Sequence, residues 1–344
     1  MSFESPITPQ RVGWYRTPVS RADMARLLER SDAQGLAQAL GHLGLGLATG
    51  AAAWYASLAL PWYVFLLALC VHGTVFSFLG AAFHELSHQT VFKTKALHAP
   101  FLNLVSWLVW LNPVWYWASH QEHHKYTLHP PDDLEVVLPY EVTWASFLRS
   151  AFVNPWDLVY RWRGYLRTAF GRVNGRWDQH LFPPEASEQR RRLRTWARLA
   201  LLGHLALVIV AILTGWWQLI VLVTLAPYYA GGLRYLAEVP QHAGLQDNVP
   251  DFRLCTRTYT VNPVVEFLYW HMNYHLDHHM FAAVPCYHLG KLHRLIAPDL
   301  PPTPHGLIAT WREILAIVAR QRVDPGYQYA APLPAPRALP ANGG

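Results

Sequence analysis

The sequence predicts an all-α membrane protein with four transmembrane helices in two hairpins, interfacial or re-entrant helices, and a cytosolic helical cap. Its 344 residues are 52% hydrophobic and include 16 Trp and 17 Tyr. A mean hydropathy of +0.08 is too high for an average soluble chain and too low for membrane spans alone. Apolar stretches occur in two close pairs, and arginines gather on one side of them. Together these observations indicate spans plus a sizeable cap.

The four predicted spans cover residues 36–60, 62–83, 198–214 and 217–236. Each approaches the roughly 20 residues that cross a bilayer core. Pro61 separates the first pair and Gly215-Trp216 the second, and such short links predict two hairpins. Trp62, Trp216 and Trp217 would lie at the far interface as aromatic anchors.

Three short motifs concentrate histidine at helical spacing: HELSH at 84–88, HQEHH at 120–124 and HLDHH at 275–279. Residues three and four apart share a helix face, so each motif directs two or three imidazoles toward one point. Three such histidine boxes indicate a multinuclear metal site. The predicted ligands are His84, His88, His120, His123, His124, His275, His278 and His279.

Several further residues are candidates near this site. His242, just after the fourth predicted span, is expected to be a ninth ligand. His271 and Glu238 either ligate metal or support ligands. The carboxylates inside the boxes, Glu85, Glu122 and Asp277, either orient ligating histidines or are solvated. Asp132 and Asp133 are either loop charges or similar supports. By contrast, we expect the isolated His42, His72 and His204 to be packing residues.

The number and type of ligands indicate two metal ions. Eight or more imidazoles exceed the needs of one ion, and a donor set without thiolates permits iron, zinc, copper or nickel. The three cysteines (Cys70, Cys255 and Cys286) form neither a disulfide framework nor an iron–sulfur ligand set. The net charge of +6 comes from arginines beside apolar segments, which does not favour nucleic-acid binding.

The boxes also constrain the topology. Only the apolar segment Leu97–Trp117 separates the first two boxes. A single crossing there would put the boxes on opposite sides of the membrane, so this segment should not span if they share metals. Asn103 and Asn112-Pro113 would interrupt it, which predicts an interfacial or re-entrant helix pair. Residues 1–35 and 118–197 are rich in arginine, whereas the loops near Pro61 and Gly215 carry no Lys or Arg. The histidine side and both termini should therefore be cytoplasmic.

The predicted organisation has three parts. Residues 1–35 form a cytosolic N-terminal segment, and residues 36–324 form the membrane domain. Its cap comprises residues 118–197 and 237–324. Residues 325–344, rich in Pro and Ala, would be a disordered tail.

The three boxes resemble those of the membrane-bound fatty acid desaturase family. The likeness extends to the stretch Met272–Phe281 and to Val284-Pro285. It implies a centre of two iron ions held by the eight box histidines and His242, with O2 as co-substrate. It also implies an acyl chain as substrate and no catalytic residue beyond the metal centre. Glu238 departs from the Asn that some members carry there, and Ala282 from the usual Pro.

Turnover with O2 needs two external electrons. No cysteine quartet or dinucleotide-binding fingerprint is present, so a separate donor of the ferredoxin or cytochrome b5 type is expected. The same boxes also serve hydroxylases and other oxygenases acting on a lipid, an alkane or a small apolar metabolite. A membrane metal transporter is a more remote alternative, because it would need ionisable residues within the spans.

Overall fold

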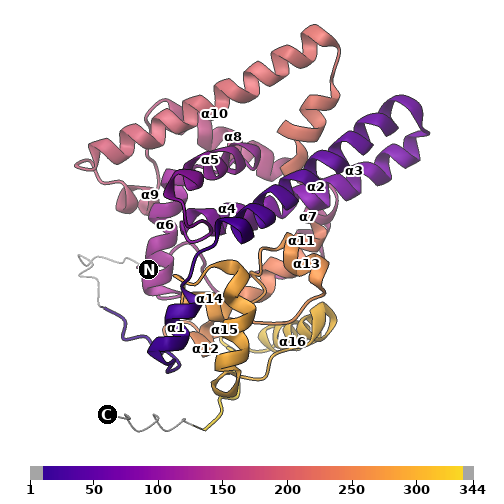
Figure 1. The fold of residues 1–344 in the computed structure, drawn as a ribbon. Helices are drawn as coiled ribbons and strands as arrows, with labels where there is room; N and C mark the ends of the chain where they lie inside the picture. The colour runs from indigo at the N-terminus through magenta and orange to yellow at the C-terminus, as the bar shows by residue number, and fades with distance from the viewer. Residues whose placement is uncertain (1–10, 336–344) are drawn as a thin grey trace.

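The computed structural model describes residues 11–335, and within these residues it is helical with no β-strand. A long hairpin of α2 (Asp32–Ala59) and α3 (Trp62–Ser77) projects from the body of the molecule (Figure 1). Ser31 caps α2 by accepting a hydrogen bond from the amide of Gln34. After a break at Phe78, α4 (Leu79–Ser87) continues the direction of the chain into the body. The first predicted hairpin is therefore present.

Two helical segments among the described residues are long and apolar enough to cross a membrane, Trp62–Ser87 and Ser187–Thr214. The second is α10, which begins at Ser187 rather than at the predicted Arg198 and includes the arginine-rich stretch. Helix α2 also has 28 residues, but glycines, His42 and two glutamines interrupt its apolar run, and it is not one of these two segments. Length and composition thus support two of the four predicted spans.

The predicted fourth span, 217–236, is wrong as a continuous helix. The segment consists of a π-helix η2 (Ile220–Thr224), a 3-10 helix η3 (Ala226–Tyr228), an extended link and α11 (Gly232–Glu238). Pro227 lacks the N–H that would continue the helical ladder.

Side chains satisfy the carbonyls that this break frees. His72 Nε2 contacts the Leu222 carbonyl at 2.8 Å, and Trp110 Nε1 donates to that of Thr224 at 3.0 Å. Irregular backbone is tolerated at membrane depth only when its polar groups are paired in this way. The return of the second hairpin is therefore a broken segment braced by its neighbours.

Residues 97–117 also divide differently from expectation. Helix α5 (His98–Leu108) runs through Asn103, and the break comes at Asn112, which caps α6 (Pro113–Tyr126) by accepting from the amides of Val114 and Trp115. At 1.5 Å per residue α5 is about 16 Å long, too short for a bilayer core of about 30 Å.

The remaining helices complete the body. The middle of the chain contributes α7 (Trp144–Ala151), α8 (Pro155–Ala169) and α9 (Arg176–Leu181). The other elements are α1 (Arg21–Leu27), η1 (Lys95–Leu97), η4 (Val239–Gln241), α12 (Phe252–Cys255), α13 (Pro263–Leu268), α14 (His275–Met280), η5 (Cys286–His288), α15 (Leu289–Ile296), η6 (Ala297–Asp299) and the longer α16 (Gly306–Gln321). The main core joins α4 to the C-terminal elements through buried side chains such as Phe83, Phe252 and Leu276.

Both ends of the described chain are attached to this body. The Trp14 indole donates to the Lys125 carbonyl at 2.8 Å and stacks on Phe252, with 4.0 Å between centroids. Tyr15 and Thr17 donate to Asp299 at 2.7 and 2.6 Å.

At the C-terminus, the Tyr329 amide donates to the Gly244 carbonyl at 2.9 Å, and Gln328 bonds Asp247. This part of the predicted tail is thus bonded to the body. Residues 1–10 and 336–344, also part of the predicted terminal segments, lie outside the described residues.

Candidate metal centre

Three helix segments and one turn carry the histidines. Box one lies at the C-terminal end of α4, box two in the second half of α6, and box three forms most of α14. His242 directly follows η4. Because Asn112 and Pro113 fix where α6 begins, they also fix the direction in which its histidines point.

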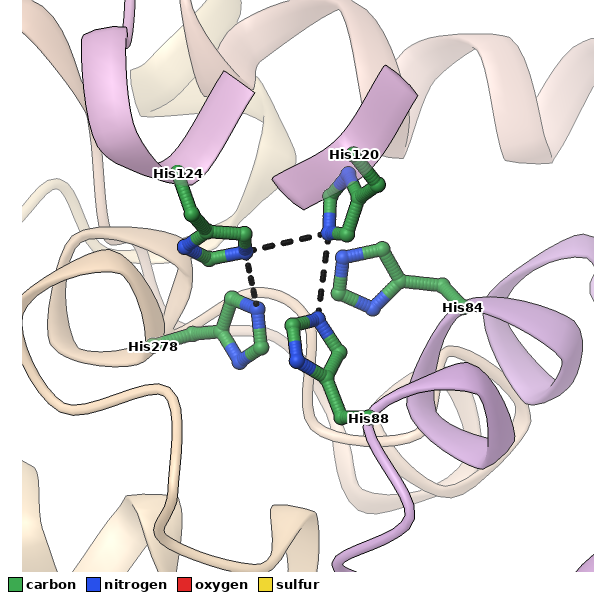
Figure 2. Close-up of side chains that lie close together, drawn as sticks. All are labelled: His84, His88, His120, His124 and His278. Atoms are coloured by element: carbon green, nitrogen blue, oxygen red, sulfur yellow. Dashed lines mark hydrogen bonds between the residues drawn. The ribbon is translucent and has the colours of Figure 1, made fainter. Parts of the chain in front are cut away.

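The nine predicted histidines lie in two groups. Group one consists of His84, His88, His120, His124 and His278 (Figure 2). Group two consists of His123, His242, His275 and His279. Within each group the potential ligand atoms lie within 4.8 Å of one another. Each group can therefore hold a metal ion.

The Nε2 atoms within each group face one another. In group one, His120 Nε2 lies 3.0 Å from both His88 Nε2 and His124 Nε2, and the His124–His278 distance is 3.2 Å. In group two, His275 Nε2 lies 2.9 Å from that of His242 and 3.1 Å from that of His279. All members of group two are buried, whereas His84, His88 and His124 of group one are partly exposed.

Helical spacing explains how single boxes serve both groups. His120 and His124 are four residues apart and share a face, as do His275 and His279. His123 and His278 lie about a hundred degrees around their helices from an adjacent histidine, so they reach the other group. Boxes two and three thus contribute to both groups, which holds the groups side by side.

Hydrogen-bond acceptors around the two groups fix the tautomers of several imidazoles. Nδ1 of His120 donates to Glu135 at 2.7 Å, and Nδ1 of His123 donates to Asp133 at 2.8 Å. His242 Nδ1 donates to the carbonyl of Cys255 at 2.9 Å. A neutral imidazole that donates from Nδ1 has a lone pair on Nε2. These lone pairs point into the groups, an arrangement that a bound cation stabilises.

Unpaired nitrogens give independent evidence for metal binding. His84 Nε2 in group one is buried and has no hydrogen-bond partner among the described residues. A buried polar atom without a partner costs about 1–3 kcal/mol. Its position inside a ring of imidazoles is the one expected for a metal ligand.

The electrostatics keep most of these imidazoles neutral. Burial, reinforced by neighbouring histidines, lowers the pKa of five of them well below the usual 6.5: His120, His124, His275, His278 and His279. Burial also lowers the pKa of His242, to about 3. His123 differs, because the Asp133 carboxylate outweighs the effect of burial and raises its pKa. Neutral imidazoles are the form that binds metal.

The other candidate residues have different surroundings. Buried Glu85 lies 2.9 Å from His84 Nδ1 and 3.7 Å from His278 Nδ1, so it borders group one. The remaining four lie outside both groups. Glu122 pairs with Lys125, half-exposed Glu238 pairs with Arg234, His271 bonds Glu266, and buried Asp277 bonds Thr258 and His293.

Glu135 is the supporting residue that the sequence reasoning missed, and the role of Asp133 was left open. Both lie in the loop after box two and fold back onto it. Glu135 accepts from Ser119 at 2.6 Å as well as from His120. The available signal was a run of carboxylates, Asp-Asp-Leu-Glu, close behind a histidine box.

The isolated histidines are packing residues, as expected. His42, His72 and His204 contact the carbonyls of Val75, Leu222 and Trp107, respectively. His204 also lies between the rings of Trp107 and Trp110. Their nitrogens are thus occupied by neighbours within the fold.

Fold and site together define a helical protein with apolar hairpins and a polyhistidine centre that can hold metal. The sequence profile described as fatty acid desaturase matches residues 60–311, well over half of the chain. The chain belongs to this family. A search of curated proteins finds no significant match.

Proposed function

We propose that this protein is a membrane-bound di-iron oxidoreductase that desaturates an acyl chain of a fatty acid or lipid. Overall, one O2, two electrons and two protons combine with two hydrogens removed from adjacent carbons, giving a double bond and two waters. The observation that carries the proposal is the convergence of nine imidazoles in two adjacent groups, in a chain of the fatty acid desaturase family.

The donor geometry favours a metal with more than four ligands. With metal–nitrogen bonds of about 2.0–2.1 Å, nitrogens at right angles about an ion lie about 2.9 Å apart, whereas tetrahedral ones lie about 3.3 Å apart. Of the five nitrogen separations, three at 2.9 to 3.0 Å lie nearer the first value, one at 3.1 Å lies midway, and one at 3.2 Å lies nearer the second. Group one also offers five donors. Both observations suit iron better than tetrahedral zinc.

The protein's own residues would hold and orient this centre. The nine histidines would be the ligands, and Glu135 and Asp133 would fix the rings of His120 and His123 through their Nδ1 hydrogens. Burial of group two would exclude water from that side. Bound iron would supply the reduction of O2 and the oxidation of the substrate C–H bonds.

We place the protein in a membrane, with the histidine side and both termini in the cytoplasm. The apolar spans Trp62–Ser87 and Ser187–Thr214 support membrane insertion, and the arginines at the start of α10 support the orientation. With three cysteines in 344 residues, electrons would come from a separate donor of the ferredoxin or cytochrome b5 type. If the purified chain catalysed the reaction with NAD(P)H as the sole reductant, the proposal of a separate electron donor would be wrong.

The test is expression in a host of known fatty acid composition, with mass spectrometry of the lipids and metal analysis of the purified chain. We expect products lacking two hydrogens and two irons per chain. His123→Ala should abolish both, whereas His180→Ala, an exposed histidine outside the groups, should abolish neither. Products with one added oxygen would instead favour a hydroxylase on the same scaffold. A single exchangeable zinc ion per chain would contradict both the desaturase and the hydroxylase proposals.

A further inference from the structure

Helices α7 and α8 and the residues that directly follow them expose five large aromatic side chains. The exposed fractions are 78% for Trp144, 69% for Phe152, 70% for Trp156, 72% for Tyr160 and 78% for Phe170. At roughly 150–250 Å² per aromatic side chain, these five expose about 550–900 Å² in total. Soluble monomers seldom leave this much aromatic surface exposed over so short a stretch of chain. A surface of this kind is expected to contact something other than water.

The outer face of α8 combines aromatic residues with arginines. Trp156, Tyr160, Arg163, Arg167 and Phe170 follow one another at spacings of four, three, four and three, so they form one stripe. All five are exposed. Arg163 and Arg167 form no ion pair with any described residue.

The inner face of the same helix is occupied by the fold. Tyr165 and Ala169 are buried in a cluster with Trp110 and with Ala197 and Ala200 of α10. The outer stripe therefore has no partner within the described chain, while the helix itself is firmly held.

Both ends of α8 are hydrogen-bonded to the second hairpin, which α10 and the broken return at 217–236 form. At its C-terminal end, the Arg198 guanidinium donates to the Ala169 carbonyl at 2.9 Å. Directly after Arg198, α10 exposes Leu199, Leu202 and Leu205.

At the other end, the Asn154 amide donates to the carbonyl of Tyr228, in the broken return of the hairpin, at 2.8 Å. Helix α8 accordingly lies beside α10 near its arginine-rich end (Figure 1).

We propose that the outer face of α7 and α8 lies in the headgroup region of the membrane and binds anionic phospholipid. The inference rests on the membrane placement proposed above. Aromatic side chains favour the interface between lipid and water, and unpaired arginines attract anionic headgroups. Continuity with the apolar surface of α10 favours lipid over an acidic protein as the occupant. Residues 144–170 would then belong to the interface rather than to a cap surrounded by water.

Spin labels on the full-length protein in lipid nanodiscs test the placement. In a Cys70→Ser background, single cysteines would replace Tyr160, Leu213 or Gln179, because Cys255 and Cys286 are buried. Frequent collisions of a spin label with O2 indicate that the label lies in lipid. Frequent collisions with a water-soluble nickel complex indicate that it lies in water. We expect O2 to dominate at 160 and 213 and nickel to dominate at 179.

Labels at positions 160, 213 and 179 distinguish failure of the interfacial surface from failure of the membrane placement. Nickel dominance at 160 with O2 dominance at 213 would overturn the interfacial surface and leave the membrane placement intact. Nickel dominance at 213 would overturn the membrane placement itself. Spin–spin coupling at 160 that disappears on dilution with unlabelled protein would also overturn the proposal, because a second copy would then cover the face.

Lipid charge provides the second test. The thermal midpoint should be higher in nanodiscs of phosphatidylcholine with phosphatidylglycerol than in phosphatidylcholine alone. The double variant Arg163→Gln/Arg167→Gln should lose this difference. The matched control Arg312→Gln/Arg322→Gln removes the same charge from exposed positions at α16 and should retain it. Equal loss in both variants, or no lipid dependence in the unmodified protein, would overturn the role of the arginines.

Discussion

At the scale of single residues, the geometry of the centre depends on the residues that accept a hydrogen bond from Nδ1 of its histidines. Glu135 and Asp133 both accept an Nδ1 hydrogen, and both sit on a loop rather than on a helix. Each hydrogen bond fixes the rotation of the ring and, in the neutral imidazole, holds the proton on Nδ1, so that Nε2 has the lone pair. A ligand held in this way loses less freedom when it binds a metal.

Glu135→Gln should weaken metal binding more than a charge change elsewhere in the box. An amide is a poorer acceptor for the His120 Nδ1 hydrogen, and losses of outer partners typically cost about 10–100-fold in metal affinity. Iron extraction by a chelator would measure the effect. Glu122→Gln is the matched control, since Glu122 pairs with Lys125. Equal extraction rates in the two variants would contradict the role of Glu135.

At the scale of elements, the beginning of α6 determines the register of box two. Asn112 Oδ1 accepts the amides of Val114 and Trp115, and its Nδ2 donates to the Leu193 carbonyl of α10 at 3.0 Å. One residue therefore starts the histidine helix and fastens it to the arginine-rich end of α10.

Asn112→Ala should lower the thermal midpoint, because losing such a cap costs about 1 kcal/mol. Asn112→Asp retains the cap oxygen but cannot donate to Leu193, so its loss should be smaller. The midpoints of both variants in one detergent would test this ranking. An Asp variant as unstable as the Ala variant would show that the contact with α10, rather than the cap, stabilises α6.

Elements also show what the sequence could and could not predict. Hairpin α2–α3, the break at Asn112-Pro113 and the convergence of the histidines follow from hydropathy, proline and helical spacing. The broken return at 217–236 does not, because its apolar residues fit a helix equally well. Only His72 and Trp110, distant in sequence, make its irregular backbone tolerable. The pairing of Glu135 with His120 likewise depends on how a loop folds back.

At the scale of the whole molecule, stability should depend on pH when iron is absent. Seven histidines of the two groups that lie outside the proposed membrane spans have lowered pKa values in the folded chain: His88, His120, His124, His242, His275, His278 and His279. Below about pH 6.5 the unfolded chain binds protons that the folded chain does not, so stability falls as the pH falls. His123, whose pKa is raised by Asp133, and Glu135, whose pKa is raised by burial, oppose this trend.

The thermal midpoint of the iron-free protein should therefore drop between about pH 7.5 and about pH 5.5. The lowered pKa of His242 alone gives a loss on the order of 1 kcal/mol one unit below 6.5. Iron-loaded protein should lose less while its metal is retained. A midpoint of the iron-free chain that stayed constant or rose on acidification would show that these histidines are not buried as described.

The contacts of Trp14, Tyr15 and Thr17 bear on how the molecule is made. Tyr15 and Thr17 bind Asp299, 284 and 282 positions further along the chain. During synthesis the side chains of Tyr15 and Thr17 lack this partner until Asp299 has been added, and group two lacks His275 and His279 until shortly before that point. Assembly of the centre is therefore a late event in biogenesis. A ribosome-bound chain carries boxes one and two while about 150 further residues are added before the third box begins.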